Sequence, residues 1–322
     1  MKTLFITGHR KSGTTLLTSL FDGHDDVAVY PTDLSLMYAY FPYFNNNNYS
    51  FKVKKERIKK ILKKSLSVNL SYRVKKKNLK INDFIRNILS RLNRKNINNI
   101  KGVLNILKNE FTKFYNLENK KYFLIKETSS DIYFNNIFKK KDSIKFIHLI
   151  RDPRDNYASL KSGIKTHYSK IGESNLILLS SMINRAKLDF KFININKKIY
   201  GNKNYLVIKY EELIKNTDKT MKKISNFLKI KYSNKMLFSS IFNIKTKSNT
   251  FTKKRTTEIN NKSIKRWKNE LSQKEKSILN FFFKSELKKF YKINAEKDIK
   301  YNYISDFYSL LNKKFFFNDS FK

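Results

Sequence analysis

A short turn near the N-terminus combines the residue types that bind phosphate and sulfate groups. Gly8 and Gly13 bracket it, an apolar run precedes it, and a segment with one apolar face follows it. We therefore predict a strand, a turn and a helix. The first N–H groups of a helix have no partner inside the helix, so this arrangement presents them to an anion. The turn supplies the candidate ligands Arg10, Lys11, Ser12, Gly13, Thr14 and Thr15.

The order of residues in this turn differs from the Walker A loop of kinases and ATPases. That loop needs Gly-Lys followed by Ser or Thr, whereas here Lys11 precedes Ser12 and Gly13. A glycine-containing turn can also serve only to connect a strand and a helix. A lysine, a serine and two threonines in one such turn favour the binding role.

A second candidate for phosphate binding begins at Arg151, where another apolar run ends. Residues 146–163 read Phe-Ile-His-Leu-Ile-Arg-Asp-Pro-Arg-Asp-Asn-Tyr-Ala-Ser-Leu-Lys-Ser-Gly, and Ser159 follows Arg151 by eight residues. A guanidinium group matches phosphate oxygens with two parallel hydrogen bonds, and a hydroxyl group can complete the shell. The alternative is structural, with Asp152 or Asp155 pairing the arginine.

Both segments resemble those of sulfotransferases that use 3′-phosphoadenosine 5′-phosphosulfate (PAPS). Lys-Ser-Gly-Thr-Thr resembles their 5′-phosphosulfate loop, and the segment holding Arg151 and Ser159 resembles their 3′-phosphate motif. The resemblance implies an α/β fold with a parallel sheet of about five strands and helices on both faces, of the P-loop type. The alternation of predicted strands and helices favours the same class. The resemblance also implies transfer of a sulfonate group from PAPS to a hydroxyl or amine acceptor, without a metal.

The resemblance also assigns catalytic roles to charged residues of this chain. Lys11 and Lys126 would stabilise the negative charge that grows on the bridging oxygen as the S–O bond breaks. The acceptor needs a general base, and Asp33 fits the place of a carboxylate in branches that act on glycans or protein tyrosines, although glutamate is usual there. Glu127 is the second candidate. Cytosolic phenol sulfotransferases have a histidine where this chain has Thr128, so the chain is closer to the carbohydrate and bacterial branch.

A basic segment near the C-terminus completes the nucleotide site that the resemblance implies. Family members fold a basic loop over the 3′-phosphate, just before a Trp-Lys segment. Arg255 and Arg266 are the residues of this chain that match it, although no glycine fixes the alignment. We expect Trp267 to pack against protein rather than to stack on adenine.

Five apolar runs predict the strands that position these residues. They lie at 4–6, 27–30, 122–125, 144–150 and 205–208. We expect Pro31 to end the second strand, with Asp33 immediately beyond it. Strand ends face the ligand crevice of a parallel sheet, so Asp33 would lie near the phosphate turn. Its other possible role is the N-cap of a following helix.

We expect a single domain over residues 1–322. Residues 45–120 form a helical insertion in this prediction, because three stripes of apolar residues recur there at helical spacing. Basic amphipathic helices can lie on anionic membranes, but such stripes are more often the core-facing sides of ordinary helices. The insertion would influence acceptor selectivity and, with the base position, favours a carbohydrate. The tail at 295–322 is aromatic and basic, and we assign it no function.

The net charge of +43 at pH 7 over 322 residues is compatible with functions other than sulfonate transfer. A basic chain can bind nucleic acid or another polyanion without being an enzyme. The excess is mostly lysine spread along the whole chain, which favours a generally basic surface over a dedicated nucleic-acid groove. A kinase-like phosphotransferase is the alternative enzyme, with Asp152 as its candidate magnesium ligand.

Cysteine is absent, which excludes disulfides, thiolate metal sites and cysteine nucleophiles. The histidines do not have the spacing of a metal site; they are His9, His24, His148 and His167. No uncharged apolar stretch approaches the ~20 residues that span a bilayer. The first strand follows Met1 almost directly, so we expect no signal peptide and a cytoplasmic location.

Overall fold

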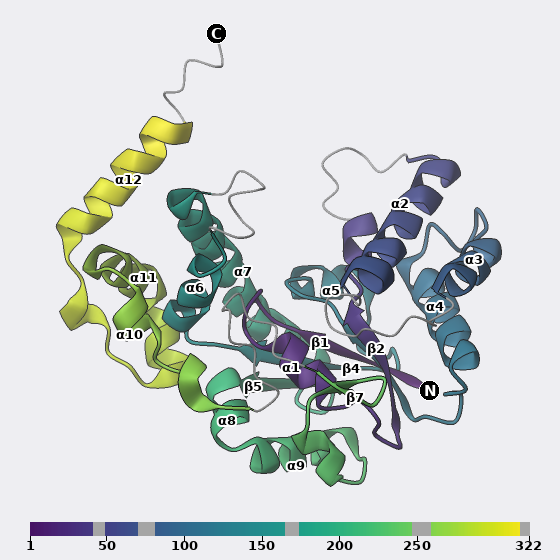
Figure 1. Ribbon diagram of the computed structural model, residues 1–322. Coiled ribbons are helices and arrows are strands. Elements are labelled where there is room, and N and C mark those ends of the chain that lie inside the picture. Colours follow the sequence, from purple (N-terminus) through teal and green to yellow (C-terminus); the bar gives the residue numbers. More distant parts are fainter. Residues whose placement is uncertain (41–48, 70–80, 165–173, 247–258, 316–322) are drawn as a thin grey trace. The chain divides into compact units, whose positions relative to one another are not determined.

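The computed structural model describes residues 1–40, 49–69, 81–164, 174–246 and 259–315 (Figure 1). The chain forms two compact units. The described residues of the first unit are those up to 150, then 192–246 and 259. The second unit contains 151–164, 174–191 and 260–315.

The first unit is built on a parallel sheet in the order β2-β3-β1-β4-β5. Its strands are β1 (Lys2–Thr7), β2 (Val27–Asp33), β3 (Tyr122–Lys126), β4 (Ile144–Ile150) and β5 (Tyr205–Lys209). The prediction of a five-stranded parallel α/β sheet is therefore confirmed. Leu4, Phe5 and Ile6 of the central strand β1 are fully buried, as expected for a strand covered on both faces.

The second strand extends further than its sequence predicts. Pro31 lies inside β2, and Asp33 is the last residue of the strand rather than the first residue beyond it. Proline lacks the N–H that a sheet ladder uses, but β2 is an edge strand and its pairing with β3 is irregular between Val29 and Asp33. The missing donor is harmless at such a position.

Helices of the first unit surround this sheet. After β1 comes α1 (Thr14–Ser19), which packs on β1, β2 and β3. Further helices of this unit are η1 (Leu36–Ala39), η3 (Asp131–Tyr133), α5 (Phe134–Ile137), α8 (Tyr210–Lys215), α9 (Thr217–Leu228) and η6 (Asn234–Leu237). A short antiparallel pair, β6 (Ser240–Ile241) and β7 (Ile244–Lys245), follows.

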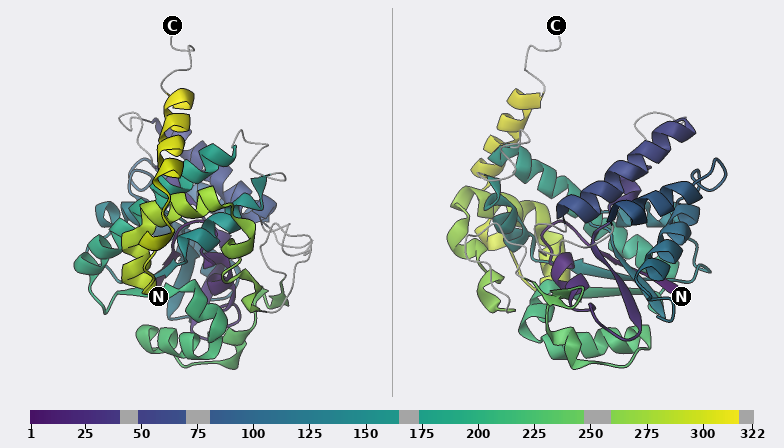
Figure 2. Two further views of the ribbon diagram at one scale, coloured as in Figure 1. Left: turned by 90° about the vertical axis from the view of Figure 1, so that its left-hand side faces the viewer. Right: turned by 45° about the vertical axis from the view of Figure 1, so that its right-hand side comes forward.

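The segment between β2 and β3 is helical, in the places where apolar stripes predict helices. It contains α2 (Phe51–Lys63), continued by the π-helical turn η2 (Lys64–Asn69), and then α3 (Ile81–Arg91) and α4 (Ile100–Phe114). Figure 2 shows α2, α3 and α4 side by side, and α2 packs on α3 and on η1. Their apolar faces are buried. Phe111 of α4, for example, lies 5.5 Å from the ring of Phe123 in β3.

The second unit is helical in its described part. Its elements are α6 (Pro153–Lys161), η7 (Asn261–Ser263), α10 (Trp267–Glu270), α11 (Gln273–Glu286), η8 (Leu287–Tyr291), η9 (Glu296–Asp298) and α12 (Tyr301–Phe315). The long helix α7 (Asn175–Tyr200) begins in this unit and ends in the first. Ser272 and Glu275 form a capping box at the start of α11.

None of the helices in the described ranges combines the length and the apolar character needed to cross a membrane.

Candidate active site

The turn between β1 and α1 has the backbone of a binding loop. Gly8 has φ +141° and Gly13 has φ +99°, and Lys11 between them is left-handed with φ 66°. A Cβ atom on Gly8 would lie 2.1 Å from the Leu149 carbonyl oxygen, and one on Gly13 would lie 2.3 Å from the ring of Tyr210. Because larger residues are excluded there by both space and conformation, the two glycines fix the path of the loop.

The loop keeps polar groups available for an anion. Leu17 N–H makes the first helical bond, to the Gly13 carbonyl oxygen at 3.1 Å, so the N–H groups of Thr14 and Thr15 precede it. Ser12 is only 1% exposed, and its hydroxyl has no hydrogen-bond partner among the described residues. Buried hydroxyl groups are rarely left unpaired unless a ligand or water satisfies them. The loop therefore fits a phosphate or sulfate group.

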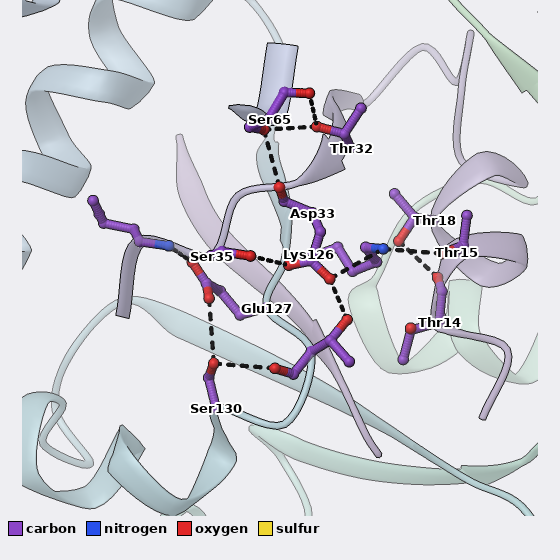
Figure 3. A network of polar contacts seen from close by, with 12 residues as sticks. Thr14, Thr15, Thr18, Thr32, Asp33, Ser35, Ser65, Lys126, Glu127 and Ser130 are labelled. Atoms are coloured by element: carbon purple, nitrogen blue, oxygen red, sulfur yellow. Dashed lines mark hydrogen bonds and ion pairs between the residues drawn. The ribbon is translucent and has the colours of Figure 1, made fainter. Parts of the chain in front are cut away.

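Lys126 links this loop to the neighbouring strand end. Its ammonium group donates to Thr15 Oγ1 at 2.9 Å and lies 3.2 Å from Asp33 Oδ2 (Figure 3). Lys126 is 7% exposed. The register of the sheet explains the contact, because Asp33 and Lys126 are paired residues of β2 and β3. One buried cation thus contacts the phosphate loop and a carboxylate.

The Asp33 carboxylate is held by donors and still reaches the surface. Ser35 donates to Oδ1 at 3.1 Å, and Thr128 donates to Oδ2. The side chain keeps 21% exposure. It is not the N-cap of the following helix, since that position belongs to Ser35. A carboxylate that is oriented, paired with a cation and accessible has the features of a general base.

Glu127 directly follows Lys126, the last residue of β3, and is fully buried (Figure 3). Its Oε1 atom accepts the N–H of Leu36 at 2.7 Å, and Met37 donates a further backbone hydrogen bond to the carboxylate. Ser130 donates to Oε2 at 3.3 Å. Burial raises the pKa of Glu127 well above 4.5, and the negative charge of Asp33 adds to the shift. Glu127 therefore holds the backbone of η1, which immediately follows the Asp33 strand.

Arg151 and Ser159 belong to the second unit. Arg151 is 6% exposed, and its Nη2 atom donates to the Ser263 carbonyl oxygen at 2.7 Å. Ser159 lies in α6 and is half-buried. Asp155 accepts the N–H groups of Lys265 at 2.6 Å and Trp267 at 3.0 Å. Burial raises the pKa of Asp155, although these hydrogen bonds and the charge of Arg151 oppose the shift. Arg151 and Asp155 together hold segment 263–267 at the start of α6.

The remaining residues predicted to bind the nucleotide differ in their surroundings. Arg266 forms two 2.8 Å hydrogen bonds to the carboxylate of Glu270, so a phosphate role requires this ion pair to open. Arg255 lies outside the described residues, as does His167. Trp267 packs under Arg154, whose guanidinium carbon is 4.0 Å from the ring centroid, in agreement with the expected packing role.

Sequence reasoning missed two hydroxyl groups around Asp33. Ser35 follows Asp33 by two residues, and Thr128 follows Lys126 by two residues. Each donates to one oxygen of the Asp33 carboxylate. The local spacing could have indicated Ser35, because a hydroxyl two residues beyond a strand-end carboxylate can fold back toward it. Thr128 reaches Asp33 across the sheet, a contact that no local spacing specifies.

Comparisons with known proteins bear on the fold and the family of the chain. The sequence profile described as "Sulfotransferase family" matches residues 3–234. No curated protein sequence matches the chain significantly. Among solved structures, the sulfotransferase domain from the curacin biosynthetic pathway has a TM-score of 0.55 and 16% identity, covering 88% of this chain and 96% of that one. The sulfotransferase domain from the Synechococcus PCC 7002 olefin synthase has a TM-score of 0.52 and 17% identity, covering 84% and 88%. The likeness to these two structures shows a shared fold. The family profile matches most of this chain, and this match shows that the chain belongs to the sulfotransferase family.

Proposed function

We propose that the protein transfers a sulfonate group from PAPS to a hydroxyl group of an acceptor, and that this acceptor is a carbohydrate. One observation carries the proposal: Lys126 contacts both the loop residue Thr15 and the carboxylate of Asp33. An anion loop, a buried cation and an accessible carboxylate are the three parts that sulfonate transfer to a hydroxyl requires.

The residues of the first unit have distinct roles in this reaction. The N–H groups and hydroxyls of loop 8–15 bind the 5′-phosphosulfate. Lys11 and Lys126 stabilise the charge that develops on the bridging oxygen as the S–O bond breaks. Asp33 accepts the proton of the attacking hydroxyl, and Ser35 and Thr128 orient its carboxylate. Glu127 is a positioning residue in this scheme, because both of its oxygens are engaged in the interior.

The 3′-phosphate of PAPS is assigned to the second unit, on the basis of the family motif. Arg151 offers a guanidinium group at the end of β4, and Ser159 offers a hydroxyl group from α6. Arg255 and Arg266 remain further candidates. Arg266 would have to exchange Glu270 for the phosphate.

The kinase alternative is less well supported. It needs a strand-end aspartate that holds magnesium, for which Asp152 is the candidate. Both carboxylate oxygens of Asp152 bind Arg154, at 3.0 Å from Nε and 2.7 Å from Nη2, and Oδ1 also caps α6. A carboxylate committed to a buried arginine is a poor magnesium ligand. The order of Lys11 and Ser12 in the loop, which differs from the Walker A order, also favours the sulfotransferase.

Transfer of radiolabelled sulfonate from PAPS to a panel of oligosaccharides, phenols and peptides tests the proposal. We expect a carbohydrate to be labelled by the wild type, and no labelling by Asp33→Asn although that variant still binds adenosine 3′,5′-bisphosphate. Labelling of phenols alone would contradict the acceptor class. Unchanged turnover in Asp33→Asn would contradict the choice of base.

A further inference from the structure

Helix α2 carries much more positive charge than the other helices of the insertion. Over its 13 residues it has a single acidic residue, Glu56, and seven basic ones: Lys52, Lys54, Lys55, Arg57, Lys59, Lys60 and Lys63. Helix α4 has three lysines and one glutamate over its 15 residues. A general drift toward lysine would affect both helices alike, so it does not account for α2.

Three of the basic residues of α2 share one exposed face. At 100° per residue, Lys52, Lys60 and Lys63 fall on the same side of the helix, and all three are exposed. Ile58 and Leu62 on the opposite side are 1% exposed. None of these three lysines forms an ion pair with any residue in the described ranges. Glu56, which lies 3.2 Å from Lys59, is exposed on the same side of the helix, between Lys63 and Lys60 at 100° per residue. The face therefore carries three positive charges and one negative charge.

This face is tied directly to the strand that ends in Asp33. Arg57 donates to the carbonyl oxygens of Ala39 at 3.1 Å and Tyr38 at 3.0 Å, which fixes α2 against η1. At the other end of the helix, Ser65 of η2 donates to the Asp33 carbonyl oxygen at 2.9 Å. Helix α2 is thus held at Arg57 and, through η2, at Ser65 to the segment that carries the candidate base.

Two tyrosines accompany the lysines. Tyr38 is 39% exposed and Tyr49 is 38% exposed, and Arg57 lies 4.8 Å from the ring centroid of Tyr49. The electron-rich face of an aromatic ring attracts the polarised C–H groups of a sugar. Exposed lysines on α2, together with exposed tyrosines that adjoin the helix at Arg57, therefore suit a sugar polymer that carries anionic groups.

We propose that the acceptor is an acidic polysaccharide and that the α2 face binds it: Lys52, Lys60 and Lys63 pair with its carboxylate or sulfate groups, and Tyr38 and Tyr49 contact its rings. This inference rests on the proposed sulfotransferase function, which it narrows to one substrate class. A membrane is the less suitable partner. A helix that binds membranes inserts its apolar side into lipid, whereas the apolar side of α2 is buried in the protein.

The test compares two triple variants of the full chain. Lys52→Gln, Lys60→Gln and Lys63→Gln remove three charges from α2. The control, Lys215→Gln, Lys219→Gln and Lys223→Gln, removes three exposed lysines from α8 and α9 and has the same net charge. Fluorescence anisotropy with a labelled oligogalacturonate at about 0.15 M salt measures binding. Because each lysine that faces an anionic group strengthens binding about fivefold, the α2 variant should bind about 100-fold more weakly, and the control less than about threefold more weakly.

Equal weakening in both variants would overturn the proposal, since binding would then follow net charge alone. Tighter binding of duplex DNA or of anionic phospholipid vesicles than of oligogalacturonate would also overturn it. Calorimetry with adenosine 3′,5′-bisphosphate on the same samples keeps the two proposals separate. If the bisphosphate fails to bind the wild type, the sulfotransferase assignment fails, whereas the comparison of the lysine variants still reports on the α2 face.

Discussion

Substitutions at Glu127 test whether its carboxyl group has a structural or a catalytic role. Glu127→Ala removes the acceptor for the N–H groups of Leu36 and Met37, both at the start of η1. A buried donor left without a partner costs about 1–3 kcal/mol, so we expect a loss of about 2–6 kcal/mol in the free energy of unfolding. Glu127→Gln keeps a carbonyl oxygen for these donors, and its amide can donate to Ser130. We expect that variant to lose less than about 1.5 kcal/mol.

The pH dependence of stability gives the sharper comparison. The pKa of Glu127 is raised in the folded protein by burial, so the folded chain holds this proton more tightly than the unfolded chain. The stabilisation is complete below the unfolded pKa, near 4.5, and is lost as the pH rises toward the folded pKa. Glutamine does not ionise. The wild type should therefore lose stability relative to Glu127→Gln as the pH rises above about 4.5, by at most about 1.4 kcal/mol per pH unit.

Urea unfolding of the wild type, Glu127→Gln and Glu127→Ala at a series of pH values measures these differences. Sulfonate transfer by the folded Glu127→Gln variant is measured in parallel, and we expect at least about one-tenth of wild-type kcat because its barrier should rise by less than about 1.4 kcal/mol. A constant stability difference between the wild type and Glu127→Gln at all pH values would refute the raised pKa of this buried carboxyl group. Loss of turnover in a stable Glu127→Gln variant would show that Glu127 is the base.

Three further substitutions test the loop and its neighbours. Ser12→Ala should change stability by less than about 1 kcal/mol, because its hydroxyl has no partner in the described part of the chain, yet weaken bisphosphate binding about tenfold in calorimetry. Gly13→Ala should abolish bisphosphate binding and lower the melting temperature, since its Cβ would lie 2.3 Å from the Tyr210 ring at a positive φ; normal binding would contradict the loop geometry. Thr128→Val should lower kcat about tenfold by removing a donor to Asp33, while Thr128→Ser keeps it; equal rates in the two variants would exclude the positioning role.

The sheet was largely predictable because buried parallel strands are continuous apolar runs. Residues 144–150 have the predicted bounds, and β1, β3 and β5 differ only at their ends. Pro31 misled the prediction, because whether a proline ends a strand depends on whether the strand lies at an edge. The order of the strands, which no local pattern specifies, placed β2 at the edge.

The strand, turn and helix of the candidate phosphate loop were predictable, but the assembly around the loop was not. Lys126 and Thr15 are 111 positions apart, and they meet because β3 lies between β2 and β1. The family resemblance ranked Asp33 first and Glu127 second as candidate bases, without a physical difference between the two carboxylates. The structure distinguishes them by burial, since Glu127 is enclosed and Asp33 keeps 21% exposure.

The ion pair of Arg266, unlike the contacts of Lys126, has a local signal in the sequence. Glu270 follows it by four residues on a short helix, a spacing that favours an ion pair. That local signal was present in the sequence, whereas the family motif indicated a phosphate ligand. The proposed phosphate role now depends on the cost of breaking two 2.8 Å hydrogen bonds.

Calorimetric titration of the wild type with adenosine 3′,5′-bisphosphate, without added metal, tests the central assignment most directly. The account predicts one site with a dissociation constant of about 10 μM or lower, corresponding to about −7 kcal/mol. It also predicts at least about tenfold weaker binding in Lys11→Ala and Arg151→Ala, since each loses a charged hydrogen bond to phosphate. Tighter binding of ATP with magnesium than of the bisphosphate, or bisphosphate binding that neither substitution alters, would contradict it.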